Sequence, residues 1–504
     1  MTMHRVLFIV LLLPSLVFAA DTGPKPGEPV SYYKHVRPIL QGACHGCHQP
    51  AKAKGGFVMT EFAALVKGGE DDGAAIVPGK PAESALIKNV TPGPDGKAEM
   101  PKKGDPLKAT EIALLSQWIS EGAKDDTPVN VVQRYSPEHP PVYLQPPGIN
   151  SLAWSPDGQT LAIAGFHEVI LYKADGSAPA GRLIGLSERI TAVRYSPDGK
   201  YLAATGGLPA RMGEVQIWQT ADAKLKLSVP VTYDTTYGAS WSPDSKLVAF
   251  GCATDKSMRA IDADTGAQVL FMAGHDDWVL DTVFSTKGDH VISVGRDQTA
   301  KLTELATQRF MDNLTSITPG ALKGGLTAID RHPQRDEILV GGADGVPQIY
   351  RMVRLVQRRI GDNSNLIKRF AAMEGRIWSV DYSTDGKRVL AASSLDGKGA
   401  VNIYSADFDS ALPDNIKGIF GKVSTSRSAE ENAAVEKYQT EGAALQHHVE
   451  LPCGIYTAQF SPDGNIIAAA GQDGIVRLIN AADGKVAKEF LPVTLSPAVT
   501  APGK

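Results

Sequence analysis

The stretch Cys44-His45-Gly46-Cys47-His48 decides how the first part of this chain is built. Two cysteines separated by two residues and followed at once by a histidine form the attachment motif of a c-type haem. The two thiols can add to the two vinyl groups of one porphyrin, and the histidine can bind the iron from below. The motif predicts one covalently bound haem c, with Cys44 and Cys47 as attachment residues and His48 as the proximal iron ligand.

Two other kinds of site also use closely spaced cysteines: a thioredoxin-like dithiol and half of a zinc site. A thioredoxin motif belongs in a βαβ unit, and no such pattern surrounds Cys44 and Cys47. A zinc site needs further cysteine or histidine ligands, and residues 49–138 contain neither. The surroundings therefore favour haem attachment.

Residues 1–20 have the pattern of a secretory signal peptide. His4 and Arg5 give a short polar start, residues 6–17 are almost wholly apolar, and small residues offer a cleavage site after Ala19 or Ala20. The apolar run is too short to cross a bilayer comfortably. We expect cleavage, with an uncleaved anchor as the alternative. The expected product is a periplasmic or otherwise exported protein with no transmembrane segment after signal cleavage.

Length and composition set the broad class. A chain of 504 residues predicts two to four domains. A hydrophobic content of 43% is ordinary for a globular protein, and a net charge of −4 leaves no electrostatic footprint for nucleic acid. Two of the four cysteines lie outside the haem motif. We expect these two, Cys252 and Cys453, to be buried as small apolar side chains and not joined in a disulfide.

Residues 28–124 are predicted to form a small all-α domain. Apolar spacing over residues 32–41 indicates a helix that begins or bends near Pro38 and leads into the haem motif. A second helix is expected over residues 108–121, and a loop that carries Met100 lies between the two. This order of helix, haem motif, methionine loop and closing helix is typical of a class I-type cytochrome c.

The same region resembles the planctomycete-type cytochrome c domain. The motifs that carry the resemblance are Tyr32 to Leu40, the haem motif, Gly55-Gly56-Phe57, Ile76 to Pro81, Ser84 to Ile87, Met100-Pro101 and Gln117-Trp118-Ile119. The resemblance implies a single covalently bound haem with His48 and Met100 as its axial ligands.

The physical argument for Met100 as the distal ligand stands beside that resemblance. A methionine thioether opposite a histidine raises the reduction potential of a haem and suits electron transfer. Met100 lies in a polar loop next to a proline, where a methionine that only fills a core gap is less expected. Met59, eleven residues past His48, is the rival ligand. We prefer Met100, because its loop lies 52 residues beyond His48 and can return across the haem.

A linker and a repeat follow. Residues 125–148 contain six prolines and little periodic pattern, which predicts a semi-stiff, extended linker. From Ile149 onward each unit has an apolar strand, a turn of the Ser-Pro-Asp-Gly type, a second strand, a Gly/Asp turn and a third strand. The seven turns begin at Ser155, Ser196, Ser242, Ser285, His332, Ser383 and Ser461. Units of about forty to fifty residues with this pattern predict an all-β, seven-bladed propeller over residues 149–493.

The units resemble WD repeats. The best match is Gly274-His275 followed by Asp297, whereas the tryptophan of the usual dipeptide remains only as Trp218, with Gln219 after it. The Asp-His-Ser-Trp hydrogen-bond network of such repeats is therefore expected to be incomplete in every unit. We expect His275 to brace a turn.

Two features interrupt the period. Basic residues gather in and after the fifth unit, with only Asp362 in opposition; they are Arg351, Arg354, Arg358, Arg359, Lys368 and Arg369. Such a cluster is usually a solvated strand face, and an acidic partner is the alternative. Residues 406–450 form an insertion, within which residues 429–445 are expected to form a surface helix ended by His447-His448. A histidine pair by itself is weak evidence for a metal site.

Three functions fit this organisation. The leading hypothesis is an exported electron-transfer cytochrome, which is not expected to be an enzyme, with redox partner proteins docking on the haem edge or on the propeller face. The second is a propeller-based redox enzyme fed by the haem, although its candidate ligands His167, His275, His290 and His332 occupy different strand and turn positions. The third is a sensor in which an open sixth position on the iron binds a small ligand.

Overall fold

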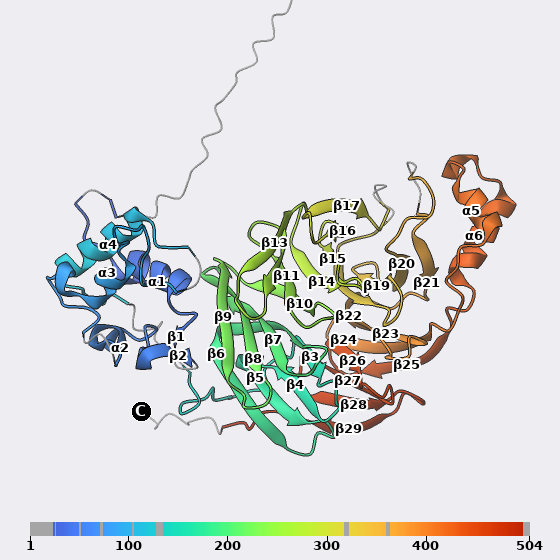
Figure 1. Ribbon diagram of the computed structural model, residues 1–504. Coiled ribbons are helices and arrows are strands. Elements are labelled where there is room, and N and C mark those ends of the chain that lie inside the picture. Colours follow the sequence, from blue (N-terminus) through green and yellow to red (C-terminus); the bar gives the residue numbers. More distant parts are fainter. Residues whose placement is uncertain are drawn as a thin grey trace, which may run out of the picture.

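A computed structural model describes residues 24–25, 27–49, 52–70, 74–102, 105–127, 135–316, 322–358 and 363–496. The expected signal peptide, residues 1–20, and part of the expected linker, residues 128–134, lie outside the described residues. The described chain has a helical N-terminal part and a larger part made of β-sheets (Figure 1). Among the described residues, no helix is long and apolar enough to cross a membrane.

The N-terminal part is a set of short helices around one apolar core. Its elements are η1 (Tyr32–Val36), α1 (Arg37–Ala43), β1 (His48–Gln49), β2 (Lys52–Ala53), η2 (Lys54–Gly56), α2 (Phe62–Lys67), η3 (Pro81–Glu83), α3 (Ala85–Val90) and α4 (Ala109–Ser120). The helix expected before the haem motif is divided: η1 has π-helical geometry, and α1 begins just before Pro38, a residue that suits the first turn of a helix. The Tyr32 ring stacks on Trp118 of α4 with centroids 5.4 Å apart, so the first and last helices close the core together.

The β part consists of five four-stranded antiparallel sheets and one seven-stranded sheet, in which every strand pairs with its neighbour in sequence. The seven-stranded sheet holds β3 (Leu152–Trp154), β4 (Thr160–Ala164), β5 (Phe166–Lys173), β6 (Pro179–Tyr195), β7 (Tyr201–Leu208), β8 (Met212–Gln219) and β9 (Leu225–Thr232). The next sheets hold β10 (Thr236–Trp241), β11 (Leu247–Cys252), β12 (Ser257–Asp262) and β13 (Gln268–Ala273), then β14 (Val279–Phe284), β15 (His290–Gly295), β16 (Ala300–Glu304) and β17 (Arg309–Asn313). The third of the four-stranded sheets holds β18 (Leu326–Arg331), β19 (Glu337–Gly342), β20 (Gln348–Arg351) and β21 (Leu366–Arg369). The sheet that follows holds β22 (Arg376–Tyr382), β23 (Arg388–Leu395), β24 (Lys398–Ser405) and β25 (Leu445–Leu451). The last sheet holds β26 (Ile455–Phe460), β27 (Ile466–Gly471), β28 (Val476–Asn480) and β29 (Val486–Phe490).

The arrangement of the sheets is that of a WD propeller, in which each sheet packs face to face with its neighbours (Figure 1). Central strands such as β8 and β19 are buried on both faces, whereas the outermost strands β17 and β29 are largely exposed. Each four-stranded sheet has one strand more than the three expected from the repeat, because the exposed fourth strand carries little apolar pattern.

The recurring Ser-Pro-Asp-Gly turns are stabilised by their own side chains. In the first turn, the Ser155 hydroxyl donates to Asp157 at 2.5 Å, and the Thr160 backbone N–H donates to the Ser155 hydroxyl at 2.9 Å. The glycine of that turn, Gly158, has a φ of +69°, a conformation that glycine adopts without steric cost. The same side-chain bond recurs from Ser196 to Asp198 at 2.7 Å.

Polar side chains join neighbouring sheets along their first strands. Asp330 on β18 accepts a hydrogen bond from the backbone N–H of Tyr382 on β22 at 2.8 Å. Gln459 on β26 accepts one from the backbone N–H of Trp154 on β3 at 3.0 Å. The second bond connects the last sheet to the first, so the ends of the repeat are held together.

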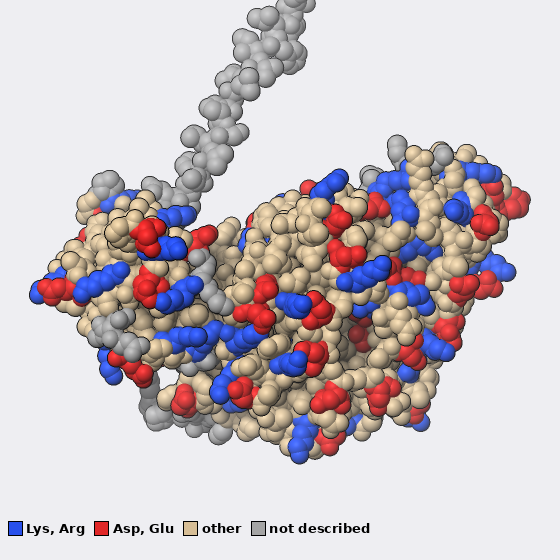
Figure 2. Space-filling view, viewed as in Figure 1, with Lys and Arg blue, Asp and Glu red and all other residues tan. Residues whose placement is uncertain are grey.

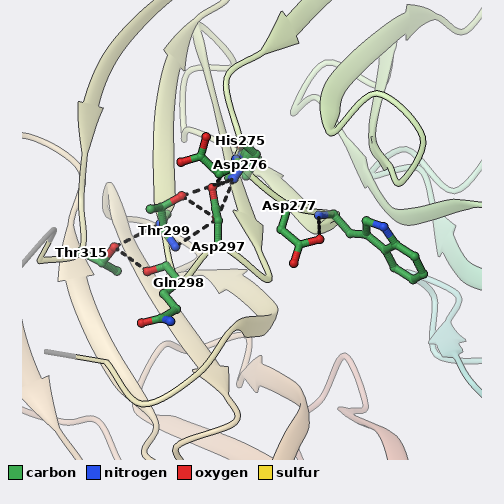
Figure 3. A network of polar contacts seen from close by, with 10 residues as sticks. His275, Asp276, Asp277, Asp297, Gln298, Thr299 and Thr315 are labelled. Carbon is green, nitrogen blue, oxygen red and sulfur yellow. Dashed lines mark hydrogen bonds and ion pairs between the residues drawn. The ribbon is translucent and has the colours of Figure 1, made fainter. Parts of the chain in front are cut away.

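The sheet of β14–β17 contains most of the expected WD hydrogen-bond network (Figure 3). The His275 ring contacts Asp297 through Nδ1 at 3.0 Å and the Ser293 hydroxyl through Nε2 at 2.7 Å. Thr303 occupies the strand position of Trp218, and its buried hydroxyl has no hydrogen-bond partner within the described part of the chain. Three of the four members are therefore present, and His275 braces the turn that holds Asp297, as expected.

Other sheets use a different pair at the same place. The aromatic residue on the third strand bonds to an amide side chain two positions earlier: Trp218 to Gln216 at 3.0 Å and Tyr404 to Asn402 at 2.8 Å. Because residues two apart on a strand point to the same face, one strand satisfies both polar groups.

The insertion and the basic cluster contact each other, which the sequence did not indicate. The insertion holds α5 (Asp414–Phe420), η5 (Ser424–Ser426) and α6 (Ala429–Thr440). Arg351 on β20 donates to the Tyr438 hydroxyl at 3.0 Å, and the Lys368 ammonium on β21 donates to the Tyr438 carbonyl oxygen. Arg369 forms an ion pair with Glu436.

These contacts correct the expectation that the basic cluster is a solvated strand face. The basic cluster is not a solvated strand face at Arg351 and Lys368, whose side chains are buried under the insertion. Two other members, Arg354 and Arg358, both pair with Asp312, an acid distant in sequence. Arg359 and Asp362 lie outside the described residues.

The end of the insertion also differs from expectation. The helix stops at Thr440, and His447-His448 lies in β25, the fourth strand of its sheet. The residues from Leu445 onward therefore belong to the sheet, and the expected insertion boundary at residue 450 is too late. His448 contacts the Asn402 side chain at 2.6 Å, and no group of three or more metal-binding side chains occurs among the described residues.

The end of the expected linker is held on the propeller. Tyr143 forms a parallel bridge with Leu495, and its hydroxyl donates to Glu168 at 2.7 Å. Glu168 in turn forms an ion pair with Arg182 of β6. This part of the expected linker is therefore anchored to the first sheet and to the C-terminal segment.

We expect His275→Ala to lower the free energy of unfolding of the propeller by about 2 kcal/mol, because Asp297 and Ser293 both lose a buried partner. His290→Ala is the matched control, since His290 pairs with Asp289 at the surface, and its effect should stay within about 0.5 kcal/mol. Equal urea midpoints for the two variants would contradict a bracing role for His275.

The pair of His275 and Asp297 predicts that the stability of the propeller depends on pH. Burial raises the pKa of Asp297, but the hydrogen bond and charge of His275 outweigh it, so the pKa is lowered to about 2. The resulting stabilisation is present above the ordinary aspartate pKa and is lost as the pH falls towards 2. Urea midpoints measured between pH 5 and pH 2 should therefore fall less steeply for His275→Ala than for the wild type.

Tyr438→Ala should lower the free energy of unfolding of the propeller by about 1–3 kcal/mol, because it removes the hydroxyl that binds Arg351 and the ring beside Lys368. This loss is measured as a lower thermal midpoint. Tyr233→Ala is the control, since Tyr233 is 70% exposed. An unchanged midpoint for Tyr438→Ala would show that the insertion contributes nothing through this contact.

Candidate haem-attachment site

The motif at residues 44–48 forms a tight turn directly after α1. The backbone N–H groups of Cys47 and His48 both donate to the Cys44 carbonyl oxygen at 3.1 Å. His48 then begins β1, which pairs with β2 in a two-stranded ribbon. The turn and the ribbon hold both cysteines and the histidine on one short, compact segment.

The imidazole of His48 is oriented by a backbone carbonyl. Its Nδ1 lies 3.3 Å from the carbonyl oxygen of Phe57, a bond that requires Nδ1 to carry the proton. Burial lowers the pKa of His48, and hydrogen bonds to the backbone oppose that change without cancelling it. The ring is thereby held in the neutral tautomer whose Nε2 can bind a metal ion.

Both cysteines of the motif are free thiols in the structure. Burial, with a smaller contribution from Cys47, raises the pKa of Cys44 to about 12. Cys44 packs against the apolar core that contains Leu40 and Leu115. Such surroundings favour an uncharged sulfur over a thiolate. The thioether that would join Cys44 to a porphyrin is uncharged, so it suits this position.

Both candidate methionines belong to that core, in different ways. Met59 is only 2% exposed, and its backbone N–H donates to the His48 carbonyl oxygen at 2.9 Å. Met100 packs at the edge of the core and is partly exposed, with its backbone held by the Asn89 carbonyl oxygen at 2.7 Å. Met59 therefore has the surroundings of a packing residue. The choice of Met100 as distal ligand stays a prediction.

Polar atoms near the motif fit a bound cofactor with polar edges. The side-chain oxygens of Gln49 and Thr60 are buried and have no hydrogen-bond partner among the described residues. Buried polar groups are normally paired. The Thr60 hydroxyl could donate to a haem propionate, whereas the Gln49 side-chain oxygen is an acceptor and needs a donor that a propionate carboxylate does not supply. With the two thiols, an oriented imidazole and an apolar core, the residues present fit haem c.

The motif also touches the β part, a contact that the sequence did not indicate. Gly46 lies against the backbone of Ser228 on β9. The Lys52 ammonium, four residues beyond the motif, donates to the Lys226 carbonyl oxygen on the same strand. No local sequence pattern predicts this contact, because the two segments are far apart in the chain.

The described histidines of the β part are not gathered into a second site. His275 is engaged by Asp297 and Ser293, and His290 by Asp289. His332 accepts from the backbone of its own turn and packs on Tyr382, while His167 packs between Tyr135 and Phe166. In the described residues these four candidate ligands of the enzyme hypothesis have separate local partners.

Comparison with protein families finds a match in each part. Residues 44–104 match the family described as planctomycete cytochrome C. Residues 266–303 and 440–480 match the WD domain, G-beta repeat. The chain thus joins a planctomycete-type cytochrome c domain to WD repeats, as the sequence motifs indicate.

Individual relatives match the WD part. An uncharacterised WD repeat-containing protein of Synechocystis is 30% identical over 159 residues, 29% of this chain and 41% of that protein. The WD repeat-containing protein 1 of Rattus norvegicus is 23% identical over 246 residues, 48% of this chain and 38% of that protein. The WD repeat and SOCS box-containing protein 1 of Danio rerio is 33% identical over 95 residues, 19% and 22% of the two chains. The chain spans less than half the length of each.

Replacing both Cys44 and Cys47 by serine should abolish covalent attachment, because no thiol remains in the motif. The variant should lose its haem colour on acid–acetone extraction, whereas the wild type should keep it through denaturing electrophoresis. A double Cys252→Ser, Cys453→Ser variant is the control and should retain the colour. Haem that stays covalently bound after loss of Cys44 and Cys47 would refute the assignment.

Proposed function

We propose that this protein is an exported c-type cytochrome that transfers electrons through one covalently bound haem, with the WD propeller as a platform for protein docking. The observation that carries the proposal is the His48 ring, whose Nδ1 is held by the Phe57 carbonyl so that Nε2 is available on the same turn as two free thiols. When bound, the haem supplies one-electron transfer.

The residues of the site have distinct roles in this proposal. Cys44 and Cys47 attach the porphyrin, and His48 binds the iron in a fixed orientation. Met100 is the distal ligand, at the edge of the core, while Met59 fills the interior. With haem bound, His48 and Met100 would both hold the iron, so that no ligand would have to bind or leave when an electron is transferred.

The proposal includes the division of the chain. It takes residues 1–20 as a signal peptide, 28–124 as the cytochrome domain, 125–148 as the linker and 149–493 as a propeller of seven blades. The 17 residues of β6 support the count of seven. β6 serves as the last strand of one four-stranded unit (β3–β6) and the first strand of the next (β6–β9), and five further four-stranded sheets follow.

The propeller is proposed as a docking platform because WD repeats generally hold protein partners on a rigid ring. Figure 2 shows basic and acidic side chains interspersed over the visible face of both parts, without a single-sign field. Such a surface favours recognition by shape and local contacts over long-range attraction of a strongly charged partner.

Whether Met100 binds the iron distinguishes an electron carrier from a sensor of small ligands. Met100→Ala should abolish the weak far-red absorption of the ferric sulfur–iron bond, lower the reduction potential and let carbon monoxide bind the reduced haem. Met59→Ala is the matched control; it should destabilise the domain by about 2–5 kcal/mol but leave the spectrum and the potential unchanged.

Two results would change the proposal. If the spectral effects appear with Met59→Ala and not with Met100→Ala, the ligand assignment is wrong. If the wild-type reduced protein binds carbon monoxide readily, the carrier gives way to a sensor with an open position on the iron.

A further inference from the structure

The haem-attachment loop is seated on the outer edge of the seven-stranded sheet. Strand β9 is the last strand of that sheet, and it pairs only with β8. An edge strand presents backbone groups that natural proteins usually cover or protect. Figure 1 shows the helical part beside β9, where the carbonyl oxygens of Lys226 and Ser228 meet Lys52 and Gly46.

Gly46 permits the closest part of this contact. A Cβ atom added at Gly46 would overlap the carbonyl oxygen of Ser228 and would lie 3.7 Å from Cδ of Pro230. Gly42, in the preceding helix, has open space around the same position. The haem motif itself accepts any residue between its cysteines. The glycine at position 46 is therefore explained by the propeller and not by haem attachment.

The strand cannot easily move away to make room for a side chain. The Ser228 hydroxyl donates to the carboxylate of Glu214 on β8, which is fully buried. Ser187 and Gln216 also donate to that carboxylate, at 2.5 and 2.8 Å. Four polar side chains thus fix the part of β9 on which Gly46 rests.

Contacts around this point extend the interface. The Gln41 side-chain amide lies 3.9 Å from the sulfur of Met212. The Arg211 guanidinium lies 5.8 Å from the centroid of the Tyr33 ring, within the range of a cation–π interaction. Helix α1, the haem motif and β2 all contact the same part of the propeller, so the contact resists rotation as well as separation.

We propose that the β6–β9 part of the propeller is the resident docking partner of the haem-attachment loop, and that Gly46 is the residue that permits this docking. The cytochrome domain is then a fixed part of the molecule and not a carrier that swings on its linker. The inference rests on the proposed function only in that the loop holds the haem. It places that haem at a constant position relative to any protein bound to the propeller.

The test uses the full chain with its haem and compares Gly46→Val with Gly42→Ala. Haem content, measured as the pyridine haemochrome, should equal that of the wild type in both variants, because the Cys-X-X-Cys-His motif is intact. Small-angle X-ray scattering should show an increased maximum dimension for Gly46→Val alone. An unchanged scattering curve for Gly46→Val with full haem content would overturn the docking inference.

A second variant addresses the case in which Gly46→Val fails to mature. Lys52→Met combined with Arg211→Ala leaves the haem motif untouched and removes a contact from each side of the interface. This variant should become more sensitive than the wild type to protease cleavage between the two domains. Wild-type resistance would count against the inference. A wild type without covalent haem would instead refute the proposed function and leave the scattering test intact.

Discussion

The propeller depends on one constraint: its sheets are apolar on both faces, so each sheet is stable only between two others. Strands such as β7 and β8 are buried along almost their whole length, which no isolated four-stranded sheet can provide. The first and last sheets must therefore meet. The bond from the Trp154 backbone N–H to the Gln459 side chain lies at that junction and satisfies a backbone donor that would otherwise be buried without a partner.

The same requirement explains the side-chain networks inside the sheets. A buried polar group costs free energy unless it is paired, and the repeats meet this cost in different ways. One sheet uses His275 with Asp297 and Ser293, while another uses Trp218 with Gln216 and Glu214. Loss of the consensus WD residues has not removed the networks, because other residues at the same depth take over the bonds.

The insertion and the haem-attachment loop cover two outer edges of the ring in comparable ways. At β20 and β21, the buried cations Arg351 and Lys368 bind the neutral oxygens of Tyr438, and α6 lies over them. At β9, Gly46 and Lys52 meet backbone carbonyl groups. In both places a segment outside the repeat forms hydrogen bonds with polar groups of the sheet. These groups are the buried cations at one edge and the backbone carbonyl groups of the edge strand at the other.

The sequence by itself determined the features whose physics is local. The haem motif needs only residues 44–48, the turns need only a serine and an aspartate two residues apart, and the apolar period reports strands that are buried on both sides. Tertiary structure decided what depends on residues far apart in the chain. Gly46 meets Ser228, Arg354 and Arg358 share Asp312, and His447-His448 lies in a strand because β24 is there to pair with it. Each of these contacts forms only when segments far apart in the chain come together, and no pattern of neighbouring residues records it.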